Sequence, residues 1–556
     1  MADPLQELRT AIHSAADALR DGSSGSVAPT LERPPKPELG DYSTNAAMLL
    51  APARGEAPRR IAELLRDELG DLLGESADRI EVAGPGFVNV FLADRWHRES
   101  LAALLAAGEG FGRGAPKAPE RVLVEFVSAN PTGPLTVASG RGAAYGDALA
   151  RLLELAGHQV EREYLLNDVG GQVTLFAESI AARMRGHEAP EGGYSGEYVA
   201  ELADDLAGRG LDADDLDRLA RAGTEAMGKG IERTLERFGV TFDTWFSERS
   251  LHEAGEIEGA ISELREQGHV YERDGAVWLR TTAFGDDKDR VLLRSDGEPT
   301  YFAADIAYHR DKLRRGAARL IDPLGADHHG YVPRMRAALE AMGYDPDRFE
   351  APMMQLVRLL EGDARARMSK RRGEFVTLDE LIDDIGVDAA RFFMVQRSHD
   401  TALDLDLELA RSQSQDNPVY YVQYAHARIA SILRKAVAEG GAANAGDGRA
   451  DEAALAAGAG AEAALDAPAA PAERALVKRL LELPAEAAAA AERRAPHRLA
   501  AYATATDADF HAFYRDCQVV GAGGGLEQAR LAICVAAKRG IATTLELLGV
   551  SAPERM

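Results

Sequence analysis

The sequence has 556 residues, of which 46% are hydrophobic and 28% are charged. This composition is ordinary for a globular protein of several domains, and no apolar run is long enough to predict a membrane span. The formal net charge of −26 argues against general affinity for nucleic acids, although a local basic patch could still bind one. The sequence starts without the pattern of a secretory signal and has only two cysteines, so we expect a cytoplasmic protein with free thiols.

Residues 1–115 predict an α+β domain. Helical periodicity covers residues 5–19 and 57–73, and a short strand is expected at residues 80–82. The alternating side chains of residues 87–92 are typical of a second strand with at least one buried face.

Residues 120–400 predict a Rossmann-like domain. Strands at 122–127 and 160–166 alternate with helices at 145–155 and 171–184. This order indicates a parallel sheet with helices on both faces. Residues from about 185 to 290 read as a mainly helical, acidic insertion that ends in hairpin strands.

Residues 401–556 carry mostly helical patterns and predict a helix bundle. Residues from about 438 to 470 are rich in Ala and Gly and poor in large apolar side chains, so we expect a loose loop there. The chain as a whole is therefore expected to be a multidomain α/β protein.

The turn NPTGP, residues 130–134, joins the first strand of the Rossmann-like domain to its first helix. Free N–H groups at a helix start bind anions, and Gly133 lets the backbone approach a ligand closely, so a phosphate site is favoured over a plain connector. The glycines within residues 140–146 do not form a dinucleotide fingerprint, because Tyr145 stands where the third glycine should be.

Polar residues elsewhere fit more than one interpretation. Tyr301 and Asp305 share a face of a predicted helix and suit a guanidinium ligand, although the pattern alone fits a core aromatic and a surface acid better. The run of residues 327–329, Asp-His-His, suggests zinc, but adjacent histidines rarely bind one ion together, so a polar edge of a nucleotide pocket is favoured.

A basic segment, RARMSKRR at residues 365–372, lies just before the helical C-terminal region. A flexible lysine such as Lys370 is suited to neutralise a leaving pyrophosphate. An ordinary basic surface loop is the alternative, and the position of the segment favours the first interpretation.

Several segments together resemble the arginyl-tRNA synthetases, which belong to the class I aminoacyl-tRNA synthetases. The resemblance covers nearly the whole chain and includes VEFVSANPTGPL (124–135), TYFAADIAYHRDK (300–312), LIDPLGADHHGYVPRM (320–335), MSKRRGEFVTLDELI (368–382) and DNPVYYVQYAHAR (416–428). It implies activation of arginine with ATP and Mg²⁺ to arginyl-adenylate, with release of pyrophosphate. Transfer of arginine to the 3′ end of tRNA(Arg) would follow, and the family needs bound tRNA before its first step.

The resemblance also assigns residues to roles. Glu125 and Asp305 match the acids that recognise the guanidinium, Tyr301 a side-chain contact, and Asn130 a contact to the α-amino or carboxylate group. Lys370 matches the catalytic lysine of the second signature. Matching ATP-binding positions are Ala129, Pro131, Thr132, Gly133, Pro134, Leu135, Gly140, Asp327, His329, Met368 and Ser369. Candidate tRNA contacts are Tyr421, Gln423, Tyr424 and Arg428. We expect a monomer without a membrane association and without a structural metal ion.

One departure from the family pattern concerns catalysis. The first signature usually reads His-x-Gly-His, whereas this chain has Thr-Val-Ala-Ser at residues 136–139. Thr136 and Ser139 can still donate neutral hydrogen bonds, so we favour an active arginine ligase in which both act in catalysis. A catalytically silent, synthetase-like tRNA-binding protein and a different nucleotidyltransferase on the same fold are the alternatives. The retained substrate-side residues argue against the first alternative, and the helix bundle argues against the second.

Overall fold

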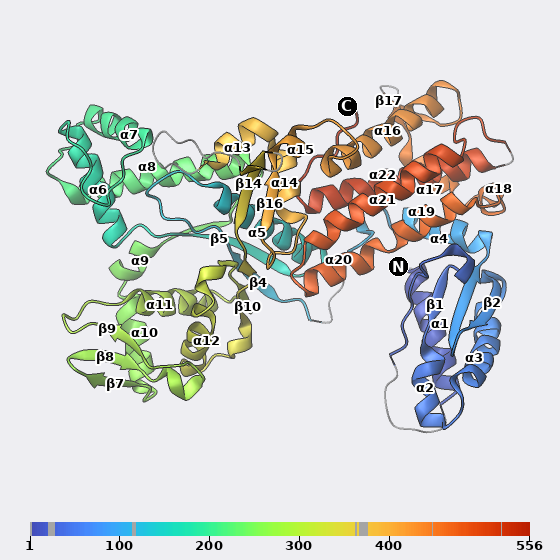
Figure 1. The fold of residues 1–556 in the computed structure, drawn as a ribbon, viewed down its shortest axis with the longest axis horizontal. Coiled ribbons are helices and arrows are strands. Elements are labelled where there is room, and N and C mark those ends of the chain that lie inside the picture. Colours follow the sequence, from blue (N-terminus) through green and yellow to red (C-terminus); the bar gives the residue numbers. More distant parts are fainter. Residues whose placement is uncertain are drawn as a thin grey trace.

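The computed structural model describes residues 3–20, 28–113, 118–361, 364–365, 376–446, 449–523 and 525–556 (Figure 1). It confirms the multidomain α/β architecture. A small N-terminal domain packs beside the C-terminal helices, and a parallel sheet lies at the centre of the molecule. Within the described ranges, no helix is long and apolar enough to cross a membrane.

The N-terminal domain contains a three-stranded antiparallel sheet in the order β1-β3-β2. Val88 and Val90 of β3 are buried, as the alternation in the sequence predicts. They belong to a core that also contains Leu8 of the first helix and Leu65 of the third. The elements are α1 (Pro4–Ala18), β1 (Tyr42–Thr44), α2 (Ala46–Arg54), α3 (Pro58–Leu73), β2 (Ala77–Ala83), β3 (Phe87–Leu92) and α4 (Asp94–Ala107).

The central sheet is parallel and has the strand order β12-β10-β4-β5-β6. Its strands are β4 (Arg121–Glu125), β5 (Gln159–Leu166), β6 (Thr244–Ser247), β10 (Arg319–Ile321) and β12 (Phe349–Glu350). The chain runs from β4 to β5 on one side, whereas β10 lies on the other side of β4. The strand order therefore reverses between β4 and β10, which is where open α/β sheets bind ligands.

Successive residues of β4 face opposite cores, which explains the apolar run in the sequence. Val122 and Val124 belong to the core that includes α5 (Val137–Leu155). Leu123 belongs to the core formed with α11 (Tyr301–Arg314) and α12 (Tyr331–Ala341). A strand with helices on both faces needs apolar side chains at every position, so the predicted parallel sheet is confirmed.

The segment 185–290, expected as an insertion, is only partly separate from the sheet. Its first part is helical, and α7 (Glu197–Gly208) and α8 (Leu216–Arg237) pack with α6 (Gly171–Met184) at the end of the molecule opposite the N-terminal domain (Figure 1). Strand β6 then joins the central sheet beside β5. The remainder contains α9 (Glu248–Glu253), α10 (Glu256–Glu266) and an antiparallel sheet of β7 (Val270–Arg273), β8 (Ala276–Leu279) and β9 (Arg290–Leu293).

The C-terminal region is helical as predicted, but residues 438–470 are more ordered than expected. They include α17 (Glu452–Gly458) and α18 (Glu462–Leu465), and Leu455 is buried. Small alanine side chains let these helices pack closely against α22, with Leu455 as the buried large apolar side chain of α17. The other main helices are α13 (Leu378–Ile385), α14 (Val387–Val395), α16 (Pro418–Ala438), α19 (Pro471–Leu481), α20 (Leu483–Glu492), α21 (His497–Asp516) and α22 (Leu526–Leu547).

Candidate active site

A cavity of about 350 Å³ lies at the point where the strand order reverses. Its walls come from the carboxyl ends of β4, β5 and β10 and from α11 and α12. Polar lining residues include Glu125, Ser128, Asn167, Asp305, His309, Asp322 and Tyr331. Such a concave site with several convergent polar groups is the expected place for a small substrate in this fold.

The backbone after β4 is strained where it enters the site. Val127 has φ +70° and Ser128 has φ +40°, a conformation that is rare for non-glycine residues and particularly for β-branched ones. Tyr164 holds the next residue, because its hydroxyl donates to the Ala129 carbonyl and accepts from the Ala129 N–H, both at 3.0 Å. Strain that is fixed in this way is typical of functional turns.

Asn130, a predicted substrate contact, is held by two other amides. Its Nδ2 donates to Gln172 at 2.5 Å, and its Oδ1 accepts from Asn167 Nδ2 at 3.0 Å. Asn167 lines the cavity, whereas Asn130 lies next to it at the start of the turn. These contacts fix the orientation of the Asn130 amide before any ligand binds.

A tyrosine from α7 contacts the turn of residues 130–134. The hydroxyl of Tyr198 donates to the carbonyl of Thr132 at 2.9 Å, and a Cβ at Gly133 would lie 3.2 Å from the same hydroxyl oxygen. Pro131 and Thr132 are buried, whereas Pro134 is exposed. The helical segment that precedes β6 thus supports the turn from outside the sheet.

The two hydroxyls that replace the signature histidines lie at the beginning of α5. Thr136 is the residue before the helix and Ser139 lies in its first turn. Neither hydroxyl has a hydrogen-bond partner among the residues that the structure describes. Both are therefore available to a ligand, and Val137 N–H donates to the carbonyl of Val376 at 3.2 Å.

The second signature segment cannot be located from these contacts. Lys370, Met368 and Ser369 lie outside the described residues. The carbonyl of Val376 accepts from the N–H of Val137 in α5, and the N–H of Leu378 donates to the Leu135 carbonyl at 2.8 Å. The residues directly after this segment are therefore bonded to the first signature.

Two of the proposed ATP-binding residues have a packing explanation. Leu135 is 2% exposed and lies in the core. A Cβ at Gly140 would lie 2.7 Å from Leu378 and 3.0 Å from Met394, so glycine allows α5 to approach α13 and α14. Gly146 is likewise required, because a Cβ there would lie 2.2 Å from the Phe126 ring.

Two acids, one on the cavity wall and one beside it, have raised pKa values. Burial raises the pKa of Asp305 to about 6, while His309 and Lys312 oppose this shift and the charge of Glu125 adds to it. Burial, followed by the charges of Asp305 and Asp168, raises the pKa of Glu248 to about 7. Neither Asp305 nor Glu248 forms an ion pair within the described part of the chain. The region is therefore suited to a cationic ligand.

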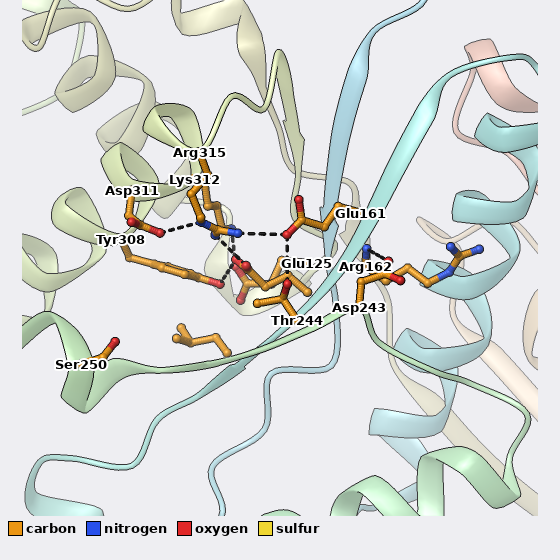
Figure 2. A network of polar contacts seen from close by, with 12 residues as sticks. Glu125, Glu161, Arg162, Asp243, Thr244, Ser250, Tyr308, Asp311, Lys312 and Arg315 are labelled. Atoms are coloured by element: carbon orange, nitrogen blue, oxygen red, sulfur yellow. Dashed lines mark hydrogen bonds and ion pairs between the residues drawn. The ribbon is translucent and has the colours of Figure 1, made fainter.

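Beneath these acids lies a buried network of charges (Figure 2). Lys312 donates to Glu125 and to both oxygens of Asp322, at 3.1 and 3.2 Å. Arg315 donates to Glu163 at 2.6 Å and to Glu161 at 3.0 Å. Figure 2 shows Lys312 of α11 and Arg315, the residue that follows this helix, extending toward the acids of β4 and β5.

The other predicted residues lie at the edge of the site or outside it. Tyr301 is 64% exposed, and its hydroxyl lies near Gly170. Asp327 and His329 are exposed and do not line the cavity, whereas the neighbouring His328 does.

Three of the four predicted tRNA contacts share a surface of α16. Tyr421 stacks on His511 with ring centroids 4.4 Å apart, and Tyr424 lies parallel to the same ring at 6.3 Å. Arg428 lies over the rings of Tyr424 and Tyr514, at 5.1 and 5.2 Å. Helical spacing explains why residues 421, 424 and 428 lie together.

The prediction for Gln423 is corrected by the structure. Gln423 lies on another face of α16 and is 8% exposed. Its amide donates to Asp388 at 2.7 Å and to the Ser551 carbonyl at 3.0 Å. Through its Nε2 the residue therefore ties α16 to α14 and to the C-terminal segment.

The sequence reasoning missed the residues that support the predicted ones. These are Asp168, Tyr198, Glu248, Lys312, Asp322 and His511. Lys312 and Asp322 lie in segments that resemble the family, but only their contacts across the sheet reveal a role. Tyr198 and His511 come from distant helices, so no local pattern could have indicated them.

Comparisons with known proteins agree with these observations. Three family models match the chain: an arginyl tRNA synthetase N terminal domain at residues 6–92, a tRNA synthetases class I (R) catalytic domain at 214–428, and a DALR anticodon binding domain at 422–556. The arginine–tRNA ligase of Carboxydothermus hydrogenoformans is 44% identical over 538 residues, which cover 95% of this chain and 94% of that one.

Two further relatives extend the similarity to full length. The arginine–tRNA ligase of Heliobacterium modesticaldum is 44% identical over 99% of both chains. The structure of Thermus thermophilus arginyl-tRNA synthetase matches with a TM-score of 0.74 and 26% identity, and both chains are fully covered.

Proposed function

The chain belongs to the arginyl-tRNA synthetase family, and from this membership we propose that it is an active ligase that attaches arginine to the 3′ end of tRNA(Arg). The carboxylate of arginine attacks the α-phosphate of ATP, which enters as its magnesium complex, and pyrophosphate leaves. The terminal ribose of the tRNA then takes the arginyl group from the adenylate, and AMP leaves. The observation that carries this proposal is the joint position of Glu125 and Asp305 on the wall of one cavity beside the signature turn.

On the arginine side, Glu125 and Asp305 bind the guanidinium. A planar guanidinium has five N–H donors in a fixed fork and can bridge two carboxylates. Tyr301 contacts the side chain at the mouth of the site, and Asn130 holds the α-amino or carboxylate group. The absence of an ion-pair partner for Asp305 among the described residues supports this role.

On the nucleotide side, the turn and the start of α5 hold ATP. The backbone N–H groups of Asn130, Gly133 and Leu135, which have no acceptor among the described residues, and the helix dipole favour phosphate. Thr136 and Ser139 donate neutral hydrogen bonds to it. Asp327 and His329 form the edge of the nucleotide pocket. Met368, Ser369 and Lys370 belong to the second signature, whose lysine neutralises the leaving pyrophosphate.

The anticodon of the tRNA binds the aromatic surface of α16 and α21. Unstacked bases stack on aromatic rings and on guanidinium planes, and Tyr421, Tyr424, Arg428, His511 and Tyr514 provide both. Replacement of His511 by Ala should lower tRNA affinity about tenfold without changing arginine affinity, as filter binding and exchange kinetics can measure. A monomeric state and a cytoplasmic location complete the proposal.

The test is ATP–pyrophosphate exchange with arginine, in the presence and absence of tRNA(Arg). We expect exchange that requires tRNA and that falls about 100-fold or more in Lys370→Ala, because a charge-stabilising donor is lost. Lys229→Ala is the matched control, since Lys229 is an exposed residue of α8 whose ion-pair partner among the described residues is Glu225 alone.

The opposite result would favour a different function. Absence of exchange in the wild type, together with intact tRNA binding, would indicate that Thr136 and Ser139 cannot replace the histidines. The chain would then be a silent tRNA-binding protein, an alternative that its ligase relatives do not support.

A further inference from the structure

Lys312 is the most deeply buried cation at the active site. Its side chain is 0% exposed, and it lies on α11 below the cavity. The ammonium donates to Oε2 of Glu125 and to both oxygens of Asp322, and it lies 4.4 Å from the centroid of the Tyr308 ring. Glu125 and Asp322 lie at the carboxyl ends of β4 and β10, and Tyr308 lies on α11.

The surrounding charges keep this lysine protonated. Burial alone would lower the pKa of Lys312, but Asp322, Glu125 and Glu163 outweigh burial, so the pKa is raised. A lysine that cannot lose its proton remains a permanent partner of the carboxylates. Arg315 forms an ion pair with Glu163, so the charge of Lys312 mainly compensates Glu125 and Asp322.

The two carboxylates differ in their other contacts. Asp322 also bonds to His309 Nε2 at 3.0 Å. Glu125 has no other partner among the described residues, and its second oxygen, Oε1, is unoccupied by them. Glu125 also lines the cavity. Among the described residues, Lys312 is therefore the only group that fixes the orientation of the Glu125 carboxylate by a hydrogen bond.

We propose that Lys312 is a positioning residue for arginine, which holds Oε2 of Glu125 and thereby presents Oε1 to the substrate guanidinium. This inference rests on the proposed function and extends it by one residue. Lys312 does not touch the substrate. It fixes which oxygen is free and prevents Glu125 from turning toward other donors, so the guanidinium can span Glu125 and Asp305 in one geometry.

A purely structural role for Lys312 makes a different prediction. Removal of the ammonium would leave two buried acids without a cation, which destabilises any fold whether or not a substrate binds. If charge balance were the only role, the loss of one acid together with the lysine should restore normal arginine binding. A positioning role predicts that arginine binding stays weak.

The experiment compares three variants with the wild type. Lys312→Met removes the ammonium, and Lys312→Met combined with Asp322→Asn removes one positive and one negative charge together. Arg310→Met is the matched control, because Arg310 is another buried cation of α11 but pairs with Glu256 and Glu263 of α10, which do not line the cavity.

ATP–pyrophosphate exchange with saturating tRNA gives KM for arginine, KM for ATP and kcat, and thermal unfolding gives Tm. We expect KM for arginine to rise about tenfold or more in both Lys312 variants, with KM for ATP and kcat within about twofold of the wild type. The control should lower Tm and leave KM for arginine unchanged.

Three results would overturn the proposal. These are an unchanged KM for arginine in both Lys312 variants, a normal KM in the double variant only, or an equal rise in the Arg310 control. If Lys312→Met alone does not fold, the double variant decides. Absence of exchange in the wild type would instead contradict the proposed function, so the two failures can be distinguished.

Discussion

The arginine side and the nucleotide side of the active site are built from different parts of the chain. The arginine side uses charged side chains on rigid elements, with Glu125, Lys312 and Asp322 below the cavity. The nucleotide side uses the backbone of the turn, which Tyr164 and Tyr198 hold by its carbonyl and N–H groups.

The difference follows from the charge of each ligand. A cation has to be met by carboxylates, and buried carboxylates need cations of their own, so a large network forms. A phosphate can be met by the backbone N–H groups that every residue except proline has, so the sequence must instead fix the backbone. On the proposed assignment, replacement of the two histidines by hydroxyls on the nucleotide side should therefore be tolerated, whereas loss of an acid on the arginine side should be severe.

The strongest test of this contrast is Asp305→Asn. The variant keeps the shape of the side chain but loses the charge that faces the guanidinium. A charged hydrogen bond of this kind contributes about 3 kcal/mol, so kcat/KM for arginine should fall roughly 100-fold while KM for ATP stays within about twofold. Exchange kinetics with each substrate varied in turn measure both.

Glu340→Gln provides the control for this substitution. Glu340 is an exposed acid near the end of α12, and it does not line the cavity. Its replacement should change neither constant. If Asp305→Asn raised the KM for ATP as much as the KM for arginine, the two sides of the site would not be independent.

Acidic pH should weaken arginine binding more than ATP binding. The pKa of Asp305 is raised to about 6 by burial, and that of Glu248 to about 7. The groups that face Asp305 are Glu125, Lys312, His309 and Tyr331, together with Glu248 from α9. As pH falls through these pKa values the carboxylates take up protons, so KM for arginine should be about tenfold higher at pH 5 than at pH 8.

The pH dependence of thermal stability tests the charge of Asp305 in a second way. Because the pKa of Asp305 is raised in the folded protein, its favourable contribution to stability is present at low pH and is lost as pH rises through about 6. Arginine supplies the missing cation at high pH, so it should raise Tm more at pH 8 than at pH 5. An equal shift at both pH values would contradict a charged role for Asp305.

The sheet and most of its helices could be predicted from sequence because their signals are local. The apolar run that predicts β4 and the helical periodicity that predicts α5 each lie within one continuous stretch of sequence. The position of β6 could not be predicted in this way, because four residues between helices carry little pattern and only pairing with β5 assigns them to the sheet. The helical content of residues 438–470 was underestimated, because a segment rich in alanine shows no periodicity of large apolar side chains.

The candidate site shows the same limit at the level of side chains. Glu125 and Asp305 could be named from the resemblance, and their cavity is formed where the strand order reverses. Gln423 was misassigned because it is next to Tyr424 in sequence but lies on a different side of the helix, where it is 8% exposed. Lys312 and Tyr198 were missed because their roles depend on contacts with residues far away in the chain.

The smallest effect is expected from Tyr198→Phe, which tests whether the backbone on the nucleotide side needs outside support. The variant keeps the ring and removes only the hydroxyl that bonds the Thr132 carbonyl at 2.9 Å. A net hydrogen bond contributes about 1 kcal/mol, so KM for ATP should rise about fivefold while KM for arginine stays unchanged.

Tyr194→Phe is the matched control for this variant, since Tyr194 lies in the loop before α7 and its ring packs against Phe176. Its hydroxyl has no hydrogen bond among the described residues, so its loss should have no effect. A rise in KM for arginine in Tyr198→Phe would mean that the turn positions Asn130 as well as the phosphates. The nucleotide side would then transmit its strain to the arginine side, and the two regions would act as one unit.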